Sequence, residues 1–148
     1  MRKIIWILVV FGLGFLACYT ILINPNWYKG LGLGDVTMSP KECERIVREI
    51  EKYDWDTKVA TAVMKAESKC NVNARGDTEP EYIFEENGRQ YGYSVGAFQV
   101  RILPGREACD TYDLATNVKC AYEIYDKDGR NFTPWTMFIN GKYLDYME

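Results

Sequence analysis

The sequence feature that most constrains the fold is an apolar run from Ile4 to Ile23, which contains no charged residue. About 20 such residues suffice to cross a bilayer as a helix. Arg2 and Lys3 precede the run, and basic residues mark the cytoplasmic side, so the chain after residue 23 should lie outside the cytoplasm. The sequence therefore predicts a single-pass protein of the cytoplasmic membrane. It has an anchor at 1–23, a Gly- and Asn-rich linker at 24–38 and an extracytoplasmic domain at 39–148.

Two forms of this anchor stay open. The run is long and has no clear small-x-small cleavage site, which favours an uncleaved signal anchor. The segment Phe15-Leu16-Ala17-Cys18 also resembles an imperfect lipobox, with Phe where Leu is usual. Cleavage before Cys18 followed by lipidation would give a lipoprotein. Both forms hold the domain at a membrane surface.

Four cysteines follow the anchor, namely Cys43, Cys70, Cys109 and Cys120. An even number of cysteines in an exported segment predicts disulfides, and four cysteines allow three connectivities. If the segments around Cys43 and Cys70 form an antiparallel helical hairpin that turns near Asp54, these two cysteines lie about equally far from the turn. This geometry favours the pairs Cys43–Cys70 and Cys109–Cys120. The spacings match no common thiolate metal site.

Composition excludes several classes of function. Two of the 18 Lys and Arg residues precede the apolar run, whereas all 21 acidic residues follow it, so residues 24–148 have a net charge of −5. A nucleic-acid partner calls for a basic face and is not expected. The chain contains no histidine, which removes Ser-His and Cys-His nucleophiles and most zinc sites. An enzyme built on this chain must use carboxylates, hydroxyls and amides, and we expect neither a metal nor a cofactor.

Cap residues predict a mostly helical domain. Helices are expected to begin at Ser39-Pro40, at Asp54 or Asp56, at Asp113 and at Thr133-Pro134, and Ser39 and Glu42 have the spacing of a capping box. A small β-hairpin is predicted in residues 81–93, around Asn87-Gly88. The predicted fold class is α+β, mostly helical, with one small β-hairpin and a preceding transmembrane helix.

The helix that contains residues 60–70 has a carboxylate on its apolar face. At about 100° per residue, Ala60, Val63 and Met64 share one face, and Glu67 projects into the same stripe. A half-buried position disfavours the charged form of a carboxylate and raises its pKa. A glutamate with a raised pKa is suited to donate protons near neutral pH, although an isolated helical glutamate is more often a boundary residue paired with a lysine.

Four segments carry motifs in a specific order. AVMKAESKCNVNA (62–74) contains Glu67 followed by Ser68, and YSVGAFQVRILP (93–104) contains the pattern Ser-x-Gly-hydrophobic-Gln. DLATNVKCAYEIY (113–125) has an Asp-x-x-x-Asn helix start, and PWTMFINGKYLDY (134–146) has a Trp and then a Gly-x-Tyr. Together these segments resemble the soluble lytic transglycosylases and goose-type lysozymes. The resemblance implies a lysozyme-like fold that acts on bacterial peptidoglycan.

The resemblance also implies roles for single residues. Glu67 is the implied catalytic residue, and the implied substrate-binding residues are Ser94, Gln99, Asn117 and Tyr143. Tyr143 is expected to reach the Glu67 carboxylate. Gln99 could instead satisfy backbone groups, Ser94 could shape a turn, and Asn117 could either cap locally or line the cleft. In lytic transglycosylases one glutamate acts as acid and then as base, and the muramic acid's own hydroxyl attacks to give a 1,6-anhydro product.

Other functions stay open at this point. A goose-type muramidase would use water held by a second carboxylate, for which Asp77, Glu85 and Glu86 are the candidates. A non-catalytic wall-binding or assembly module could share the fold. An anchored wall-cutting domain would also suit a secretion or transfer machine as partner, although no residue identifies one.

Overall fold

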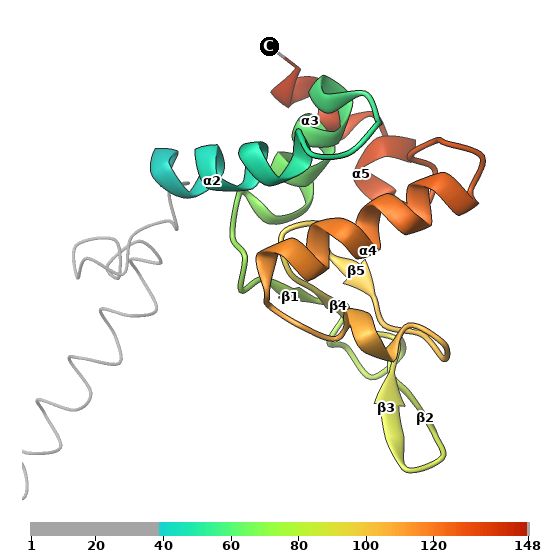
Figure 1. Ribbon diagram of the computed structural model, residues 1–148. Coiled ribbons are helices and arrows are strands. Elements are labelled where there is room, and N and C mark those ends of the chain that lie inside the picture. Colours follow the sequence, from blue (N-terminus) through green and yellow to red (C-terminus); the bar gives the residue numbers. More distant parts are fainter. Residues whose placement is uncertain (1–38, 148) are drawn as a thin grey trace, which may run out of the picture. The chain divides into compact units, whose positions relative to one another are not determined.

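The computed structural model describes residues 39–147, which Figure 1 shows as a helical part joined to small antiparallel sheets. The predicted anchor at 1–23 and linker at 24–38 lie outside the described residues. Within residues 39–147 we find no helix that is both long enough and apolar enough to cross a membrane.

Four α-helices and two short 3₁₀ helices form the helical part of the described domain. They are α2 (Pro40–Ile50), α3 (Thr57–Ser68), η2 (Glu107–Cys109), α4 (Leu114–Lys127), α5 (Thr136–Ile139) and η3 (Lys142–Tyr146). Helix α3 is the central one, because it packs against α2, α5 and η3. Helix α4 packs against α2 on one side and against β5 and η2 on the other, so it joins the helical part to the sheets.

The predicted helix starts are confirmed for α3 and α4. The Asp56 carboxylate accepts a hydrogen bond from the Val59 N–H (3.0 Å), and Asp113 accepts one from the Thr116 N–H (2.9 Å). Each cap satisfies a backbone donor that has no partner within the helix.

One predicted cap and one predicted start need correction. Helix α2 begins at Pro40 as expected, but the predicted capping box does not form: the Ser39 side chain makes no capping hydrogen bond, and the Glu42 carboxylate pairs with Arg45 (2.8 Å). Helix α5 begins at Thr136 rather than at Thr133. Thr133 is held in the preceding turn instead, where its N–H donates to the Asn131 side chain (2.8 Å).

The β-structure consists of two small antiparallel sheets. The predicted hairpin is formed by β2 (Phe84–Glu86) and β3 (Arg89–Tyr91), with Phe84 opposite Tyr91, and it projects away from the helices (Figure 1). Asn87 and Gly88 both have positive φ, as the tight turn requires. The second sheet was not predicted. It has the order β1-β4-β5, from Arg75–Gly76, Ser94–Val95 and Val100–Arg101.

Both predicted disulfides are confirmed. Cys43–Cys70 joins the start of α2 to the end of α3, and Cys109–Cys120 joins η2 to α4. The first bridge therefore closes the helical pair, and the second fastens the segment after β5 onto α4.

An aromatic cluster forms much of the core between α3, α4 and the β4–β5 loop. The Trp55 ring lies 5.3 Å from the Phe98 ring and 5.8 Å from the Tyr125 ring, measured between centroids, and Trp55 is buried. The Trp135 indole N–H donates to the Phe98 carbonyl (2.8 Å). This bond ties the segment before α5 to the β4–β5 loop, and these two segments form opposite sides of the cleft described below.

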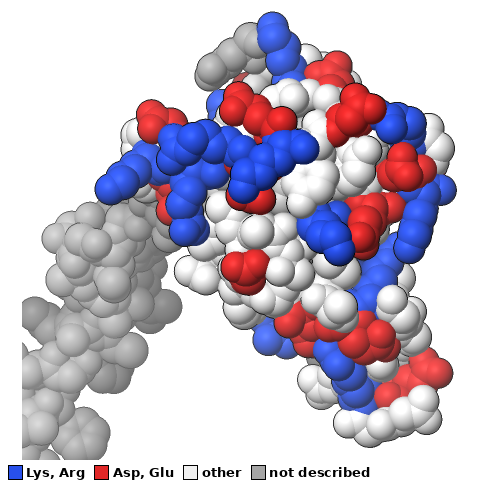
Figure 2. Space-filling model, in the orientation of Figure 1, with Lys and Arg blue, Asp and Glu red and all other residues white. Residues whose placement is uncertain are grey.

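Charged side chains of both signs share the surface. Figure 2 shows Lys and Arg gathered with Glu over α2, and the ion pairs Arg45–Glu42 and Lys52–Glu49 lie on this helix. The side chains of such exposed pairs contribute little to stability.

Candidate active site

The local sequence places Glu67 at the edge of the core. Ala60, Val63 and Met64 on α3 are fully buried, and Glu67 follows them on the same face one turn later and is half-buried. Helix α3 ends at Ser68 because Lys69 adopts a left-handed conformation with φ of 53°. The carboxylate therefore projects from the last turn of a buried helix, as the spacing predicts.

Burial and the charge of Asp77 raise the pKa of the Glu67 carboxylate, whereas a backbone hydrogen bond lowers it. Desolvation is the largest cause of a raised Glu67 pKa, and the charge of Asp77 raises it further. The Met137 backbone N–H donates to Glu67 Oε1 (3.1 Å), which lowers the pKa by stabilising the anion. The net result is a pKa above the ordinary value of a glutamate. A carboxyl group in this state can hold a proton and still release it.

Glu67 lines a cleft of about 360 Å³ between the helical part and the sheets. One side comes from β1, β4, β5 and the base of the hairpin, and the other from the segment that leads into α5. The lining residues are Glu67, Asp77, Tyr82, Ser94, Gln99, Arg101, Pro134, Trp135, Thr136 and Met137. The cleft thus combines carboxylates, amide and hydroxyl groups, one guanidinium and two aromatic rings, a set suited to a polar substrate with apolar ring faces.

A second carboxylate lies in the cleft with Glu67. Asp77 follows β1 with a positive φ of 52°, and it accepts a hydrogen bond from the Ser94 hydroxyl. Of the three acids considered as second carboxylates, Asp77 lines the cleft, whereas Glu85 and Glu86 lie exposed on β2 and do not. Asp77 comes directly after β1 rather than on the hairpin, and this explains its different position.

Gln99 lies on the sheet side of the cleft. Its side-chain N–H donates to the Gly96 carbonyl (2.9 Å), and its backbone has a positive φ of 46°. A Cβ at Gly76 would stand 2.4 Å from Gln99 Oε1, so a glycine on β1 leaves the space that the Gln99 amide occupies. Gln99 therefore both supports the loop and borders the cleft.

Asn117 does not line the cleft. Its side chain is 1% exposed, its Oδ1 accepts from the Phe98 N–H (3.1 Å), and its Nδ2 donates to the Val95 carbonyl (3.0 Å). It neither caps α4, which Asp113 does, nor points into the cleft. The expectation that Asn117 lines the cleft is corrected: its amide holds the β4–β5 loop from inside.

Tyr143 also lies outside the cleft lining. It belongs to η3, which packs against α3, and its ring centroid is 4.8 Å from that of Phe138. Among residues 39–147, no hydrogen bond joins the Tyr143 hydroxyl to Glu67. The expected contact with the carboxylate is replaced by the Met137 backbone N–H.

Several cleft residues were not predicted as site residues. Met137 contributes through its backbone, and a backbone donor leaves no mark in the sequence. Tyr82 and Arg101 contact each other in the cleft, where the Arg101 guanidinium lies 5.8 Å from the centre of the Tyr82 ring. The one available signal was the position of Arg101, two residues after Gln99 in the same motif.

Metal ligands are not gathered in this part of the chain. Within residues 39–147, no group of three Cys, Asp or Glu side chains is placed to hold a metal ion.

Comparison with known protein families matches residues 49–137 to the family described as lysozyme-like domain. The matched segment runs from the end of α2 to the first turn of α5 and includes Glu67, Asp77, Ser94 and Gln99. Comparison with curated proteins and with solved structures gives no match.

Proposed function

The chain belongs to the lysozyme-like domain family, and from this premise we propose that it is a peptidoglycan lytic transglycosylase. Family membership indicates a glycosidase or transglycosylase that acts on peptidoglycan. The finer proposal is that Glu67 cleaves the β-1,4 bond between N-acetylmuramic acid and N-acetylglucosamine. The observation that supports this proposal is that Glu67 lines a polar cleft while burial raises the pKa of its carboxylate.

The first half of the reaction needs a proton donor. Protonated Glu67 gives its proton to the oxygen that bridges the two sugars, and the bond from this oxygen to C1 of the muramic acid breaks. Positive charge develops at the C1 carbon and its ring oxygen. Glu67 becomes a carboxylate, and the Met137 N–H, already bonded to Oε1, stabilises the new charge.

The second half needs a base, and the same residue supplies it. The C6 hydroxyl of the muramic acid attacks C1, and the Glu67 carboxylate accepts the hydroxyl proton. A 1,6-anhydro ring forms, no water is consumed, and Glu67 ends in its starting state. A single carboxylate at the end of α3 is sufficient for this sequence of steps.

The cleft side chains supply contacts for the sugar. We propose that the Gln99 amide and the Ser94 hydroxyl bind N-acetyl or hydroxyl groups of the substrate, since both residues border the cleft. Asn117 and Tyr143 act more indirectly, the first by holding the β4–β5 loop and the second by packing near the end of α3.

Asp77 favours a second candidate function, a muramidase that hydrolyses the same bond. Its carboxylate lies in the cleft with Glu67 and is oriented by the Ser94 hydroxyl. In this position it could hold an attacking water while Glu67 donates the proton. The product would then carry a reducing muramic acid end in place of the anhydro ring.

Mass analysis of the products separates these functions. The full-length chain is incubated with purified peptidoglycan beside the Glu67→Gln, Asp77→Asn and Glu85→Gln variants. We expect products one water lighter than reducing muropeptides. The amount formed should fall about 100-fold or more with Glu67→Gln and stay unchanged with the control Glu85→Gln. Reducing products that disappear with Asp77→Asn would establish hydrolysis. Binding to the wall without any release would refute both reactions and favour a wall-binding module.

We also propose that residues 4–23 tether the domain to the cytoplasmic membrane, with residues 39–148 on the extracytoplasmic side. The two disulfides support export, because such bonds persist in oxidising compartments. A partner in a secretion or transfer machine would suit an anchored wall-cutting domain. Membrane fractionation tests the tether, and the mass of the mature N-terminus distinguishes an uncleaved anchor from lipidation at Cys18. Recovery of the full-length chain in the soluble fraction would refute it.

A further inference from the structure

The backbone that follows Glu67 has an unfavourable conformation. Lys69 and Cys70, two and three residues after Glu67, are both left-handed, with φ of 53° and 59°. Glycine is the usual residue in this conformation after a helix, because a Cβ makes it costly. Two other residues in succession therefore need contacts elsewhere in the molecule to hold them in place.

Left-handed residues other than glycine gather around the cleft. Within residues 39–147 they are Lys69, Cys70, Asp77, Asn87, Gln99 and Arg130. Asp77 and Gln99 line the cleft, and Lys69 and Cys70 follow Glu67, so four of the six belong to the surroundings of the candidate site. Strain of this kind persists where the surrounding structure imposes it, and it is concentrated at functional sites.

Side-chain bonds hold three of these residues. Asp77 accepts a hydrogen bond from the Ser94 hydroxyl, and the Gln99 side chain donates one to the carbonyl three residues earlier (2.9 Å). Cys70 is 2% exposed and is bonded to Cys43 at the start of α2. The disulfide therefore fixes the turn after α3, as the two hydrogen bonds fix the sheet side of the cleft.

This turn lies between the two carboxylates of the cleft. The chain runs from Glu67 through Cys70 to Asp77, and Asp77 follows β1, which pairs with β4. The Asp77 end of the segment is therefore held by the sheet. At the other end the last turn of α3 leads directly into the left-handed pair. A change of backbone conformation at Cys70 would alter the direction in which α3 presents the Glu67 carboxylate.

We propose that Cys70 is a positioning residue for Glu67: through its bridge to Cys43, it holds the left-handed turn that points the carboxylate at the Met137 N–H and into the cleft. This inference rests on the proposed function, since Cys70 acts through the proton donor of that reaction. Cys70 does not line the cleft and does not touch the substrate. Without the bridge the turn relaxes, and a misplacement of about 1 Å can slow a reaction about 100-fold.

The first test measures kcat and KM of the full-length chain. Cys43→Ala/Cys70→Ala should lower kcat about 10- to 100-fold and change KM less than about twofold, because the proposed sugar contacts, Ser94 and Gln99, lie on the sheet side of the cleft. Cys43→Ala/Cys70→Gly should return kcat to within about threefold of the wild type, because glycine adopts a positive φ without steric cost. A wild-type kcat in the alanine variant, or an equal loss in both variants, would overturn the proposal.

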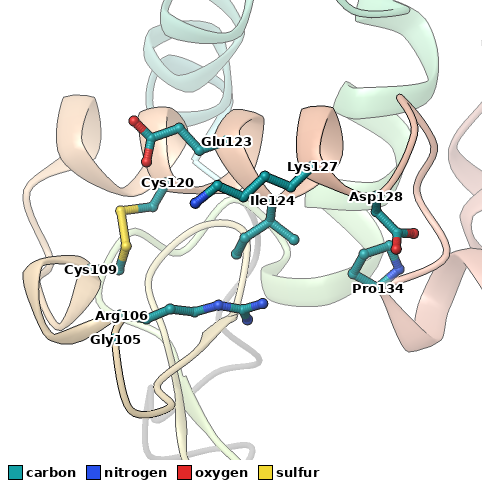
Figure 3. Close-up of a pocket in the computed structure, with 9 residues that line it drawn as sticks. All are labelled: Gly105, Arg106, Cys109, Cys120, Glu123, Ile124, Lys127, Asp128 and Pro134. Atoms are coloured by element: carbon teal, nitrogen blue, oxygen red, sulfur yellow. A yellow bond between two sulfur atoms is a disulfide. The ribbon is translucent and has the colours of Figure 1, made fainter.

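The second disulfide supplies the matched control. Figure 3 shows Cys109–Cys120 between α4 and the segment that contains Arg106, and neither cysteine lines the cleft. Cys109→Ala/Cys120→Ala should lower the stability and leave kcat within about twofold of the wild type. An equal fall of kcat in the alanine variants of both bridges would overturn the proposal. If the alanine variant of the first bridge does not fold, the glycine variant carries the test, and a kcat more than about threefold below the wild type would overturn the proposal.

The pKa of Glu67 is a readout that does not depend on catalysis. Asp77, Tyr82 and Arg101 are the titratable groups that share the cleft with Glu67, and of these the charge of Asp77 raises its pKa. The charged side chains of α2 and η3, which also pack against α3, do not contribute, and α5 has none. When the turn relaxes, the carboxylate gains water and its pKa should fall. Loss of the Met137 bond acts in the opposite direction but is weaker than burial.

NMR of isotope-labelled carboxyl carbons follows this pKa in the full-length chain in detergent micelles, and the Glu67→Gln spectrum assigns the signal. The pKa should fall in Cys43→Ala/Cys70→Ala, return in Cys43→Ala/Cys70→Gly and stay unchanged in Cys109→Ala/Cys120→Ala. An unchanged pKa in the first variant would overturn the proposal. If the wild type cleaves no glycan while the pKa follows this pattern, the proposed reaction fails and the positioning of Glu67 by Cys70 stands.

Discussion

Gly96 and Asn117 should depend on each other for stability. Gly96 has a positive φ of 77°, and a Cβ built on it would lie 2.3–2.7 Å from the three polar-end atoms of the Asn117 side chain. The Asn117 amide is buried and fills its place with two hydrogen bonds to the β4–β5 loop. Gly96→Ala therefore both strains the backbone and displaces this amide.

The cost can be worked from these two effects. A left-handed conformation costs an alanine about 1–2 kcal/mol, and each buried hydrogen-bonding group left without a partner costs about 1–3 kcal/mol. Displacing the amide leaves two loop groups unpaired, so we expect Gly96→Ala to lower the free energy of unfolding by about 3–8 kcal/mol. Asn117→Ala leaves the Phe98 N–H and the Val95 carbonyl unpaired and should cost about 2–6 kcal/mol. In the double variant the steric conflict is gone, so adding Gly96→Ala should cost only the backbone strain of about 1–2 kcal/mol.

Urea unfolding of the full-length chain, followed by tryptophan fluorescence, measures all four proteins of this cycle. The double variant should be more stable than the sum of the single effects predicts, by about 2–6 kcal/mol. Additive effects within about 0.5 kcal/mol would refute the reasoning, since residues without a shared contact behave in that way.

Two further predictions concern charge and covalent links. Asp77→Asn removes a charge that raises the pKa of Glu67, so this pKa should fall. Because the proton donor must be protonated, activity is lost as pH rises through the pKa, and the alkaline limb of the kcat/KM profile should move to lower pH. Glu85→Gln should leave the limb in place, and an upward shift with Asp77→Asn would contradict the argument. Replacing Cys43 and Cys70 by alanine opens a loop with a sequence separation of 27 and should cost about 3.5 kcal/mol in urea unfolding, whereas a loss below about 1 kcal/mol would show that α2 and α3 are held without the bridge.

The sequence predicts the helical part of this domain well because its signals are local. Asp56 and Asp113 each cap a helix by accepting a hydrogen bond from the backbone N–H three residues later. The apolar spacing of α3 places Glu67 at the edge of the core, and this can be read from the sequence without any distant contact. The sheet β1-β4-β5 was missed because its strands have only two residues each. Such strands are too short to show the alternation of apolar and polar residues by which strands are recognised.

The site was predictable only where its residues belong to a motif or a helix face. Gln99 and Ser94 border the cleft as expected, but Asn117 does not. The sequence cannot separate these cases, because an asparagine on a helix gives the same pattern whether it faces a substrate or a buried loop. Only the fold decides between these positions. The Met137 N–H could not be predicted either, since its position depends on how α5 meets α3.

The surroundings of Glu67 explain how one residue can serve in both halves of the proposed reaction. An acid that later acts as a base needs a pKa that is raised, but not so far that the anion becomes inaccessible. Burial supplies the increase, and the Met137 N–H limits it by bonding to the anion. Because this donor is a backbone group on the first turn of α5, its strength depends on the packing of α5 against α3 rather than on the side chain at position 137. The Trp135 bond to the Phe98 carbonyl precedes this turn directly, so the same contact that shapes the cleft also positions the donor.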